Sequence, residues 1–342
     1  MTRINSIKIC KQIDILLLQN NNRDALALER QIFAEAVDKG VLHCSSETQF
    51  TKISSFFSRR KIQKLVGKIL KTKILRGTVL EKYLEICKSK NVEPTILFLN
   101  TLFTEVRYPP EALKYLKKKY DAYFVLYYID PVERGTSTYA NYLREKDVFD
   151  LVFTFDKDDA YRYYLRFWQT PYSVMDVKQE NIMDLYFCGV DKDRGTIINA
   201  ISQVEQLDFS MDVIGIDSNS RYKDERIVVH KVGETISYQR VLERTLEANC
   251  ILEIVRPGQV GYTLRTFEAV VYNKKLLTNN EHIKEFEFYN PKYMKIFKSV
   301  DDIDWNWVKE KNTVNYYYNG AFSPLKLIEE IERIRCQMEK SR

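Results

Sequence analysis

Two arginines and one glutamate lie around a glycine-broken loop within residues 250–280. Arg256 and Arg265 flank the loop that contains Gly261, and Glu268 follows Arg265 by about one helical turn. Guanidinium groups are planar donors whose geometry suits phosphate oxygens. A carboxylate one turn further along a helix can accept hydrogen bonds from a sugar diol. These residues predict a site for a diphosphate, with a ribose beside Glu268.

The elements that would position these side chains are a strand, a loop, a helix and a second strand. Ile251–Val255 and Lys275–Thr278 are short apolar runs of strand character, and Thr263 can cap the helix between them. Backbone N–H groups at a helix start lack intrahelical partners and favour an anion nearby. Such units also occur in proteins that bind no nucleotide, but the flanking arginines favour the nucleotide interpretation. The loop and helix-start residues expected at the ligand are Gly261, Tyr262, Thr263 and Leu264.

Three short motifs in this region resemble those of one enzyme family. They are G-x-T-x-R-x-x-E-A (Gly261, Thr263, Arg265, Glu268, Ala269), K-x-L-x-T-N-N (Lys274, Leu276, Thr278–Asn280) and F-Y-N (Phe288–Asn290). Together they resemble bacterial glycosyltransferases of capsule, lipopolysaccharide or other surface polysaccharide synthesis, with a C-terminal domain like that of glycosyltransferase families 1 and 4. The resemblance is strongest over residues 147–300 and thin before residue 90. It implies the α/β GT-B fold, in which two Rossmann-like domains face each other across a cleft and the second binds a nucleotide-sugar donor.

The same resemblance implies a second loop at the donor. Gly189, Lys192 and Arg194 follow an apolar strand and precede a helix, where the family places the donor phosphates. The alternative is an exposed charged turn. The nucleobase is expected at the loop Lys231–Ile236, with backbone groups making most of the contacts.

Glycosyl transfer needs a stabilised leaving diphosphate and, in inverting enzymes, a base for the acceptor hydroxyl. Asp130 follows the strong strand Tyr123–Ile129 and is the first candidate for this base, although it could instead cap a turn. Glu105 is the second candidate. The acidic side chains within residues 156–159 are expected to cap a helix. No D-x-D motif lies between apolar strands, so we expect no metal and no cofactor beyond the nucleotide-sugar co-substrate.

Strands and helices alternate along the chain, which predicts parallel sheets with right-handed crossovers. We expect a Rossmann-like acceptor domain over residues 1–172 and a Rossmann-like donor domain over residues 173–322. A terminal helix, residues 323–342, is expected to cross back to the first domain. Asp158–Trp168 is predicted to be helical, and the linker is expected near Gln169–Glu180.

The composition limits the class of protein. The 342 residues suffice for two domains, and 45% apolar residues is ordinary for a globular protein. No apolar run approaches the roughly 18 residues of a spanning helix, and the N-terminus lacks a secretory-signal pattern. The six cysteines contain no C-x-x-C pair and only three histidines are present, so neither a zinc site nor a disulfide framework is indicated. We therefore expect a reduced, cytoplasmic protein.

The net charge of +6 is concentrated in one segment. Residues 48–80 contain nine basic and no acidic side chains, and apolar residues from Ile62 to Leu70 form one helical stripe. Such a helix can lie on an anionic membrane surface, and residues 59–76 are the candidate for peripheral attachment. The alternative is a helix that buries its stripe in the first domain. Because no nucleic-acid-binding signature is present, we expect no nucleic-acid partner.

Three functions are compatible with these residues. A glycosyltransferase would move a sugar from a nucleotide-sugar donor to a glycan or a lipid-linked acceptor. A nucleotide-sugar epimerase of the same fold would need acid and base groups close to the donor sugar and no acceptor cleft. A non-catalytic glycan-binding or partner protein would carry a degenerate donor site, and Asn20–Asn22 stand where many relatives of the family have glycine.

Overall fold

The chain forms two compact α/β units in the computed structural model. The first domain comprises residues 1–173 and 322–342, and the second comprises residues 174–321. The structure describes residues 13–19, 32–46, 75, 78–100, 110–132, 148–191, 193–215, 221–231, 234, 236–256 and 260–340.

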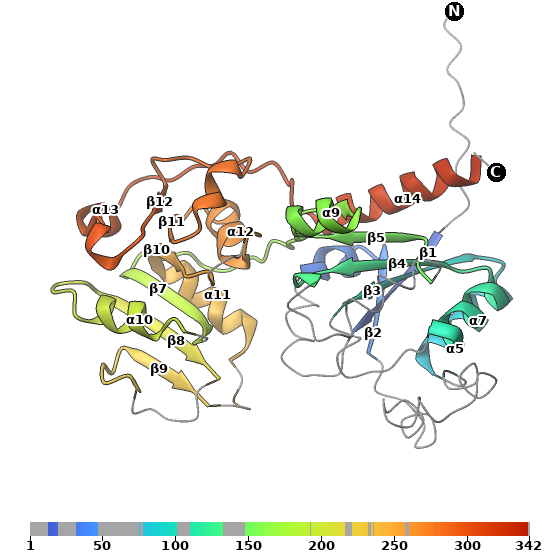
Figure 1. Ribbon diagram of the computed structural model, residues 1–342, viewed down its shortest axis with the longest axis horizontal. Helices are drawn as coiled ribbons and strands as arrows, with labels where there is room; N and C mark the ends of the chain where they lie inside the picture. Colours follow the sequence, from blue (N-terminus) through green and yellow to red (C-terminus); the bar gives the residue numbers. More distant parts are fainter. Residues whose placement is uncertain are drawn as a thin grey trace, which may run out of the picture. The chain divides into compact units, whose positions relative to one another are not determined.

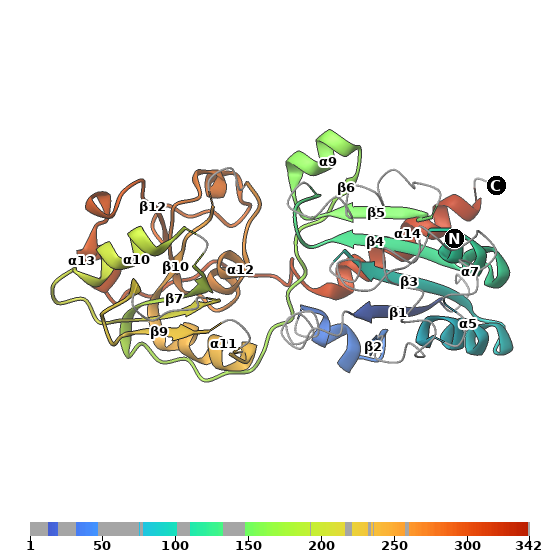
Figure 2. The ribbon, with the colours of Figure 1, turned by 60° about the horizontal axis from the view of Figure 1, so that its bottom comes forward.

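The first domain contains a six-stranded parallel sheet in the order β2-β1-β3-β4-β5-β6. Figure 2 shows this sheet with β2 at one edge and β6 at the other. β1 pairs with both β2 and β3, so the strand order reverses at β1. The strands are β1 (Ile13–Gln19), β2 (Leu42–Ser46), β3 (Glu93–Leu99), β4 (Tyr123–Tyr128), β5 (Leu151–Thr154) and β6 (Arg166–Phe167).

Helices cover both faces of the first sheet (Figure 1). α5 (Val79–Ser89) and α7 (Pro110–Tyr120) bury leucines against Phe98 and Phe124, whose rings lie 5.2 Å apart. The terminal helix α14 (Pro324–Lys340) belongs to this domain and contacts the opposite face. There Arg335 donates to Thr95 at 2.7 Å and pairs with Glu93 at 2.6 Å.

The second domain contains a six-stranded parallel sheet in the order β9-β8-β7-β10-β11-β12. Counted from the first strand of the domain, this is the 3-2-1-4-5-6 order of the Rossmann fold. β10 and β11 are buried along their whole length and β8 along most of it, as in parallel sheets covered on both faces. The strands are β7 (Met183–Val190), β8 (Phe209–Ile214), β9 (Ile227–His230), β10 (Ala248–Glu253), β11 (Lys275–Thr278) and β12 (Met294–Ile296).

The helices of the second domain divide between the two faces of its sheet. Ile198 and Ile201 of α10 (Gly195–Ser202) share one apolar core with Val308 of α13 (Trp305–Lys309). α11 (Tyr238–Glu247) packs on the opposite face, where its Val241 meets Tyr186. α12 (Leu264–Val271) lies on the α11 side, since Tyr238 bonds to Glu268. Two short 3-10 helices, η3 (Glu281–Glu285) and η4 (Val300–Asp302), flank β12.

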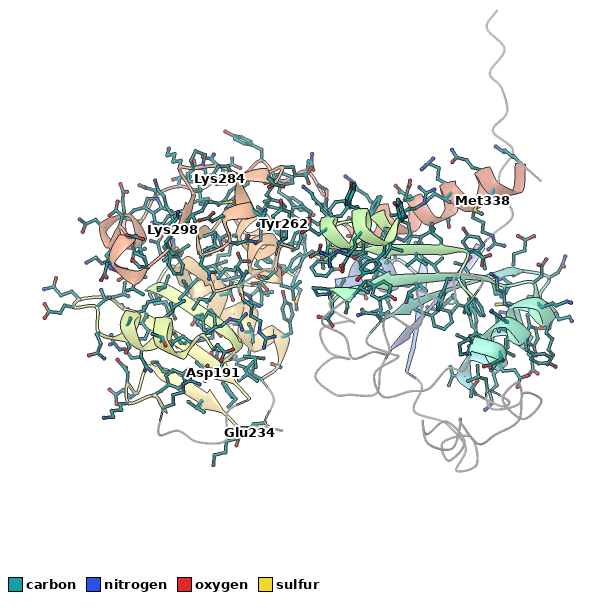
Figure 3. The ribbon with its side chains drawn as sticks, in the orientation of Figure 1. Asp191, Glu234, Tyr262, Lys284, Lys298 and Met338 are labelled. Carbon is teal, nitrogen blue, oxygen red and sulfur yellow. The ribbon has the colours of Figure 1, made fainter. Side chains whose placement is uncertain are left out.

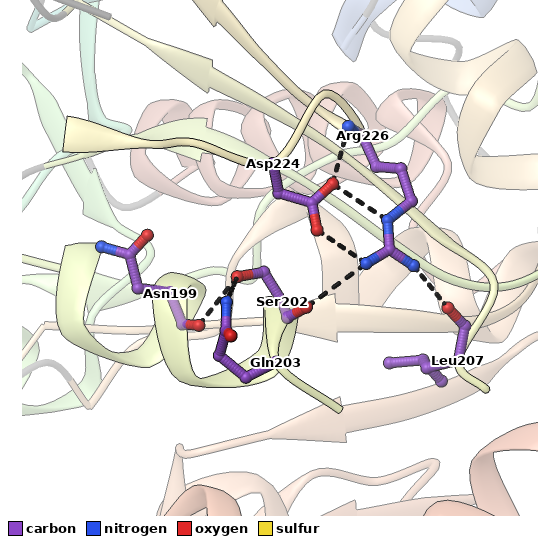
Figure 4. A network of polar contacts seen from close by, with 6 residues as sticks. All are labelled: Asn199, Ser202, Gln203, Leu207, Asp224 and Arg226. Atoms are coloured by element: carbon purple, nitrogen blue, oxygen red, sulfur yellow. Dashed lines mark hydrogen bonds and ion pairs between the residues drawn. The ribbon is translucent and has the colours of Figure 1, made fainter. Parts of the chain in front are cut away.

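One arginine fixes the carboxyl end of α10 against the sheet (Figure 4). Arg226 pairs with Asp224 through two of its nitrogens, at 2.9 and 2.6 Å. It also donates to the carbonyls of Leu207 and Ser202, and its guanidinium lies 3.9 Å from the ring centroid of Phe209. Because the far end of α10 is held in this way, the position of its amino end is set as well.

The structure confirms the predicted α/β fold class. Both domains are Rossmann-like, as the two domains of the GT-B fold are. The predicted helix Asp158–Trp168 is wrong in extent. α9 covers Lys157–Tyr163 and stops at Tyr164, whose φ of 56° is left-handed, and the chain then forms β6. β2, α5 and β12 were not predicted. Of the candidate membrane segment, residues 59–76, only Leu75 is described, and it is buried in the core of the first domain.

Two further sequence expectations concern the membrane and the cysteines. Among the described helices, none combines the length and apolar character of a membrane span. Cys87, Cys188 and Cys250 are free thiols, but Cys336 on α14 is disulfide-bonded, so the expectation that the cysteines are reduced is wrong for Cys336.

Candidate functional site

The carboxyl ends of β7 and β10 form the topological switch point of the second sheet. These strands pair directly, yet the chain leaves β7 toward β8 and leaves β10 toward β11 on the other side. Their helices, α10 and α12, lie on opposite faces of the sheet. Ligands of open α/β sheets bind in the crevice outside such a point. Both loops predicted to hold the donor begin here.

The loop after β7 turns sharply into α10. Asp193 has a left-handed φ of 72°, a conformation that aspartate tolerates, and the N–H of Arg194 donates to the Asp191 carbonyl at 2.7 Å. Gly189 still belongs to β7, where an added Cβ would lie 2.9 Å from the Phe187 ring. Because glycine has no Cβ, the ring of Phe187 can pack against this position. Lys192 lies outside the described residues.

Arg194 links the two sides of the switch point. Its Nε donates to the carbonyl of Ile254, just after β10, at 2.6 Å, and Nη1 donates to the carbonyl of Val190 at the end of β7. Arg194 is also the N-cap residue of α10, but it gives the helix no side-chain cap. The first-turn N–H groups of α10 therefore lack the side-chain acceptor that usually satisfies one of them. A phosphate contact from Arg194 itself stays a prediction.

A second arginine covers the start of α10. Arg221 pairs with the buried carboxylate of Asp191 at 2.8 Å while about half of its own side chain stays exposed. Its guanidinium lies over Gly195, where an added Cβ would be 2.5 Å from Nε. Gly195 thus allows a cationic group to approach the helix backbone closely.

The loop after β10 is tied to the sheet by one buried carboxylate. Glu253, the last residue of β10, is 1% exposed and accepts three threonine hydroxyls. Its donors are Thr263 at 2.5 Å, Thr266 at 2.8 Å and Thr278 at 2.6 Å. Thr263 also caps α12 by accepting from the N–H of Arg265 at 3.1 Å, as predicted. The start of α12 is therefore fixed at the end of the sheet.

Arg265 and Glu268 are brought together, but both point inward. Arg265 is 12% exposed and pairs with Glu268 at 2.8 Å, while Nη1 also lies 3.0 Å from the hydroxyl of Thr245. Glu268 is fully buried and accepts from the hydroxyl of Tyr238 at 2.7 Å. Burial raises the pKa of Glu268, although Arg265 and Tyr238 oppose the shift. A ribose contact from Glu268 stays a prediction, and it would require the carboxylate to leave one of these partners.

The remaining predicted donor residues differ in their surroundings. Arg256 is half-buried beside the loop and has no hydrogen-bond or ion-pair partner in the described part of the chain. Tyr262 instead packs on Phe286, with ring centroids 4.6 Å apart. Figure 3 shows Tyr262 and Asp191 well separated, each on its own loop. Gly261 is buried and Leu264 is partly buried at the start of α12.

The candidate catalytic residues belong to the first domain. Asp130 is exposed just beyond the end of β4, and Glu105 lies outside the described residues. The acidic run after β5 has the predicted capping role. Asp156 accepts from the N–H groups of Asp158 and Asp159 at the start of α9. The role of Asp130 as a base stays a prediction.

Several polar groups of the site were missed from the sequence. Tyr238 and Arg221 hold Glu268 and Asp191 from distant parts of the chain, so no local spacing indicated them. Glu253 did carry a signal, because an acid inside the apolar run Cys250–Val255 must be paired when it is buried. In the described residues, no group of three histidine, cysteine or acidic side chains could hold a metal ion.

Comparisons with known proteins add little to this geometry. No protein-family model matches the chain, and no curated protein matches it. One solved structure that aligns with the chain is an α-glucosyltransferase in complex with UDP-glucose and DNA containing an abasic site, with 10% identity over 80% of this chain and 81% of that one and a TM-score of 0.48. Another is the UDP-GlcNAc 2-epimerase of Methanocaldococcus jannaschii, with 12% identity over 95% of this chain and 100% of that one and a TM-score of 0.48. A third is T4 phage BGT with its UDP-glucose substrate, with 11% identity over 83% of this chain and 85% of that one and a TM-score of 0.44. These three share only 10–12% sequence identity with the chain at TM-scores below 0.5, which identifies no family and assigns no activity.

Proposed function

We propose that the protein is a nucleotide-sugar-dependent glycosyltransferase of the GT-B fold. The observation that carries the proposal is the cationic switch point of the second domain. Arg256 has no partner there in the described residues, and Arg194 spans the ends of β7 and β10. The amino end of α10 lacks a side-chain cap at the same point. Uncapped N–H groups beside guanidinium side chains suit a diphosphate.

The chemistry follows from the charge that develops on the leaving group. When the sugar leaves the donor, negative charge accumulates on the nucleoside diphosphate, and fixed positive groups stabilise it. Arg256, Arg194 and the helix start can supply that stabilisation without a metal. Asp130 is our proposed base for the acceptor hydroxyl, with Glu105 as the second choice. Arg265, oriented by Glu268, is a further group for the phosphates.

The acceptor is proposed from the sequence resemblance. Bacterial surface polysaccharides grow on glycan or lipid-linked acceptors, so we propose an acceptor of this class and a cytoplasmic protein. The basic segment 59–76 would hold it on the inner face of the membrane. DNA belongs among the acceptors to be tested, because the α-glucosyltransferase noted above was solved with DNA.

A ligand screen with matched variants tests the donor site. The full chain is heated with UDP-, GDP- and CMP-sugars, and a ligand at a hundred times its dissociation constant adds about 2.7 kcal/mol of stability. Arg256→Ala should abolish the shift. The control is Arg240→Ala, because Arg240 is an exposed arginine on α11 that pairs with Glu243.

The outcomes separate the candidate functions. Sugar transfer to a glycan, lipid-linked or DNA acceptor supports the proposal and names the acceptor class. Donor consumption that needs no acceptor would indicate an epimerase or a hydrolase instead. Absence of any nucleotide-dependent shift would leave a non-catalytic binding protein.

A further inference from the structure

A second polar cluster lies on the α11 side of the second sheet, outside the groups assigned to the donor phosphates. Nε2 of His230 lies 2.6 Å from Oδ1 of Asp212, and the hydroxyl of Tyr186 donates to Oδ2 at 2.7 Å. Tyr186 is fully buried and Asp212 is 6% exposed. Each oxygen of the carboxylate therefore has its own donor, and the carboxylate is held in one orientation.

This pairing fixes the tautomer of His230. A carboxylate only accepts hydrogen bonds, so the hydrogen of the neutral imidazole must be on Nε2. Nδ1 then carries a lone pair and acts as an acceptor. It has no partner in the described part of the chain, and 18% of the side chain is exposed. In its neutral form, His230 thus presents a single oriented acceptor.

The cluster adjoins the candidate donor site. Asp212 and Tyr186 come from β8 and β7, and His230 ends β9. Cys188 lies two residues after Tyr186 on β7 and belongs to the same side of the sheet. Burial raises the pKa of its thiol to about 11, and the charges of Arg265, Asp212 and Glu268 also act on it. The groups around His230 therefore continue into the pair formed by Arg265 and Glu268.

His230 also stands where the nucleoside of a bound nucleotide is expected. In a 3-2-1-4-5-6 sheet the phosphates lie at the helix after the first strand, and the ribose is bound toward the second. Here the second and third strands are β8 and β9. Gly215, just after β8, has a φ of 80° and donates to the His230 carbonyl at 2.8 Å, so the ends of these strands remain side by side.

We propose that His230 is a specificity-determining residue that contacts the nucleoside of the donor through Nδ1. The group it accepts from is an N–H of the base or a hydroxyl of the ribose. Asp212 and Tyr186 are positioning residues, because they hold the ring and its tautomer without touching the ligand. The inference rests on the proposed nucleotide site and adds the residue that selects among nucleosides.

The test compares nucleoside diphosphates with pyrophosphate by titration calorimetry on the full chain. Pyrophosphate reports the phosphate site alone, and UDP, CDP, GDP and ADP add the nucleoside. His230→Gln keeps a donor for Asp212 but removes the oriented acceptor. We expect it to weaken the preferred nucleoside diphosphate at least tenfold and to reduce the differences among the four. Pyrophosphate affinity should stay within about twofold of wild type.

His282→Gln is the matched control, since His282 is 46% exposed on η3 and pairs with Glu285. It should leave all five affinities unchanged. Equal loss of pyrophosphate and nucleotide in His230→Gln would show a structural role and overturn the proposal. Unchanged nucleoside preference would overturn it as well. If wild type binds pyrophosphate and no nucleotide, both this inference and the proposed function fail.

A second measurement needs no variant that might misfold. The protein has three histidines, so their imidazole nitrogens can be resolved by 15N NMR and assigned with His43→Gln and His282→Gln. Saturation with the preferred nucleoside diphosphate should shift Nδ1 of His230, while pyrophosphate should not. An Nδ1 signal that ignores the nucleotide would contradict the contact.

Discussion

Arg265 and Glu268 form a buried ion pair of 2.8 Å at the first turn of α12. The pair is completed by Tyr238, which donates to the other oxygen of Glu268. The two residues therefore act as one unit, in which the carboxylate orients the guanidinium. This arrangement links the stability of the second domain to the geometry of its candidate phosphate site.

Glu268→Gln should lower both stability and nucleotide affinity. The amide can still accept from Tyr238, but Arg265 would lose its buried counter-charge, and removing one partner of such a pair costs about 3–5 kcal/mol. Tyr238→Phe removes one hydrogen bond and should cost about 1 kcal/mol. Urea unfolding measures both. A Glu268→Gln protein as stable as wild type would show that Arg265 finds another partner.

Glu253→Gln should loosen the start of α12. One carboxylate accepts three threonine hydroxyls, and an amide offers only one acceptor oxygen. We expect a loss of about 2–3 kcal/mol, because a buried hydroxyl is left unsatisfied. Thr266→Val removes one donor of similar shape and should cost about 1 kcal/mol. The idea fails if the two variants unfold at the same denaturant concentration.

The sequence predicted the local parts of this site well. The N-cap Thr263 and the bounds of β11, Lys275–Thr278, match the structure because capping and apolar runs are encoded within a few residues. Loop positions were also predicted, since glycine and proline mark them directly.

Side-chain pairings over long separations could not be predicted. The ribose contact of Glu268 stays a prediction, but its hydrogen bond from Tyr238, thirty residues earlier in the chain, was not predicted. Arg221 reaches Asp191 across a similar separation. Spacing rules describe neighbours on one helix or strand, and these contacts depend on how different elements pack. The same limitation hid the cluster of His230, Asp212 and Tyr186.

Lys274 should make the stability depend on alkaline pH. Burial lowers its pKa from 10.5 to about 8, so between these values the unfolded chain holds a proton that the folded chain has lost. Stability attributable to Lys274 therefore rises with pH across this window, by at most about 3 kcal/mol. The measurement is the difference in Tm between wild type and Lys274→Met from pH 7 to 10.5.

The matched control for this pH series is Lys298→Met, because that side chain is 80% exposed. Its Tm should run parallel to wild type at every pH. If the Lys274→Met curve is parallel too, the amine keeps its proton in the folded state.

Gly195→Ala should separate the fold from the phosphate site. The new Cβ would occupy space 2.5 Å from Nε of Arg221, so this flexible, half-exposed side chain must leave Asp191. The loss of stability should match that of Arg221→Ala, because both variants leave the buried carboxylate of Asp191 without its cationic partner. Nucleotide affinity should fall, since the methyl group fills the approach to the α10 backbone. Arg221→Ala breaks the same ion pair without adding a Cβ and should bind nucleotide better than Gly195→Ala.

Asp130→Asn should suppress turnover while leaving donor affinity unchanged. A positioned general base contributes about 10²–10⁴ in rate, and the amide cannot take a proton. Asp121→Asn is the control, because Asp121 is an exposed aspartate at the opposite end of β4. Steady-state transfer assays and calorimetry of the donor together make the comparison. Unchanged turnover would remove Asp130 as the base and favour Glu105.

The most direct test of the donor site is a crystal structure of the full chain with the nucleoside diphosphate that stabilises it most. We predict the pyrophosphate outside the carboxyl ends of β7 and β10, within hydrogen-bond distance of the α10 amino end and of Arg256. Density for the nucleotide anywhere else, with Arg256 turned away from it, would contradict the assignment of the switch point as the donor site.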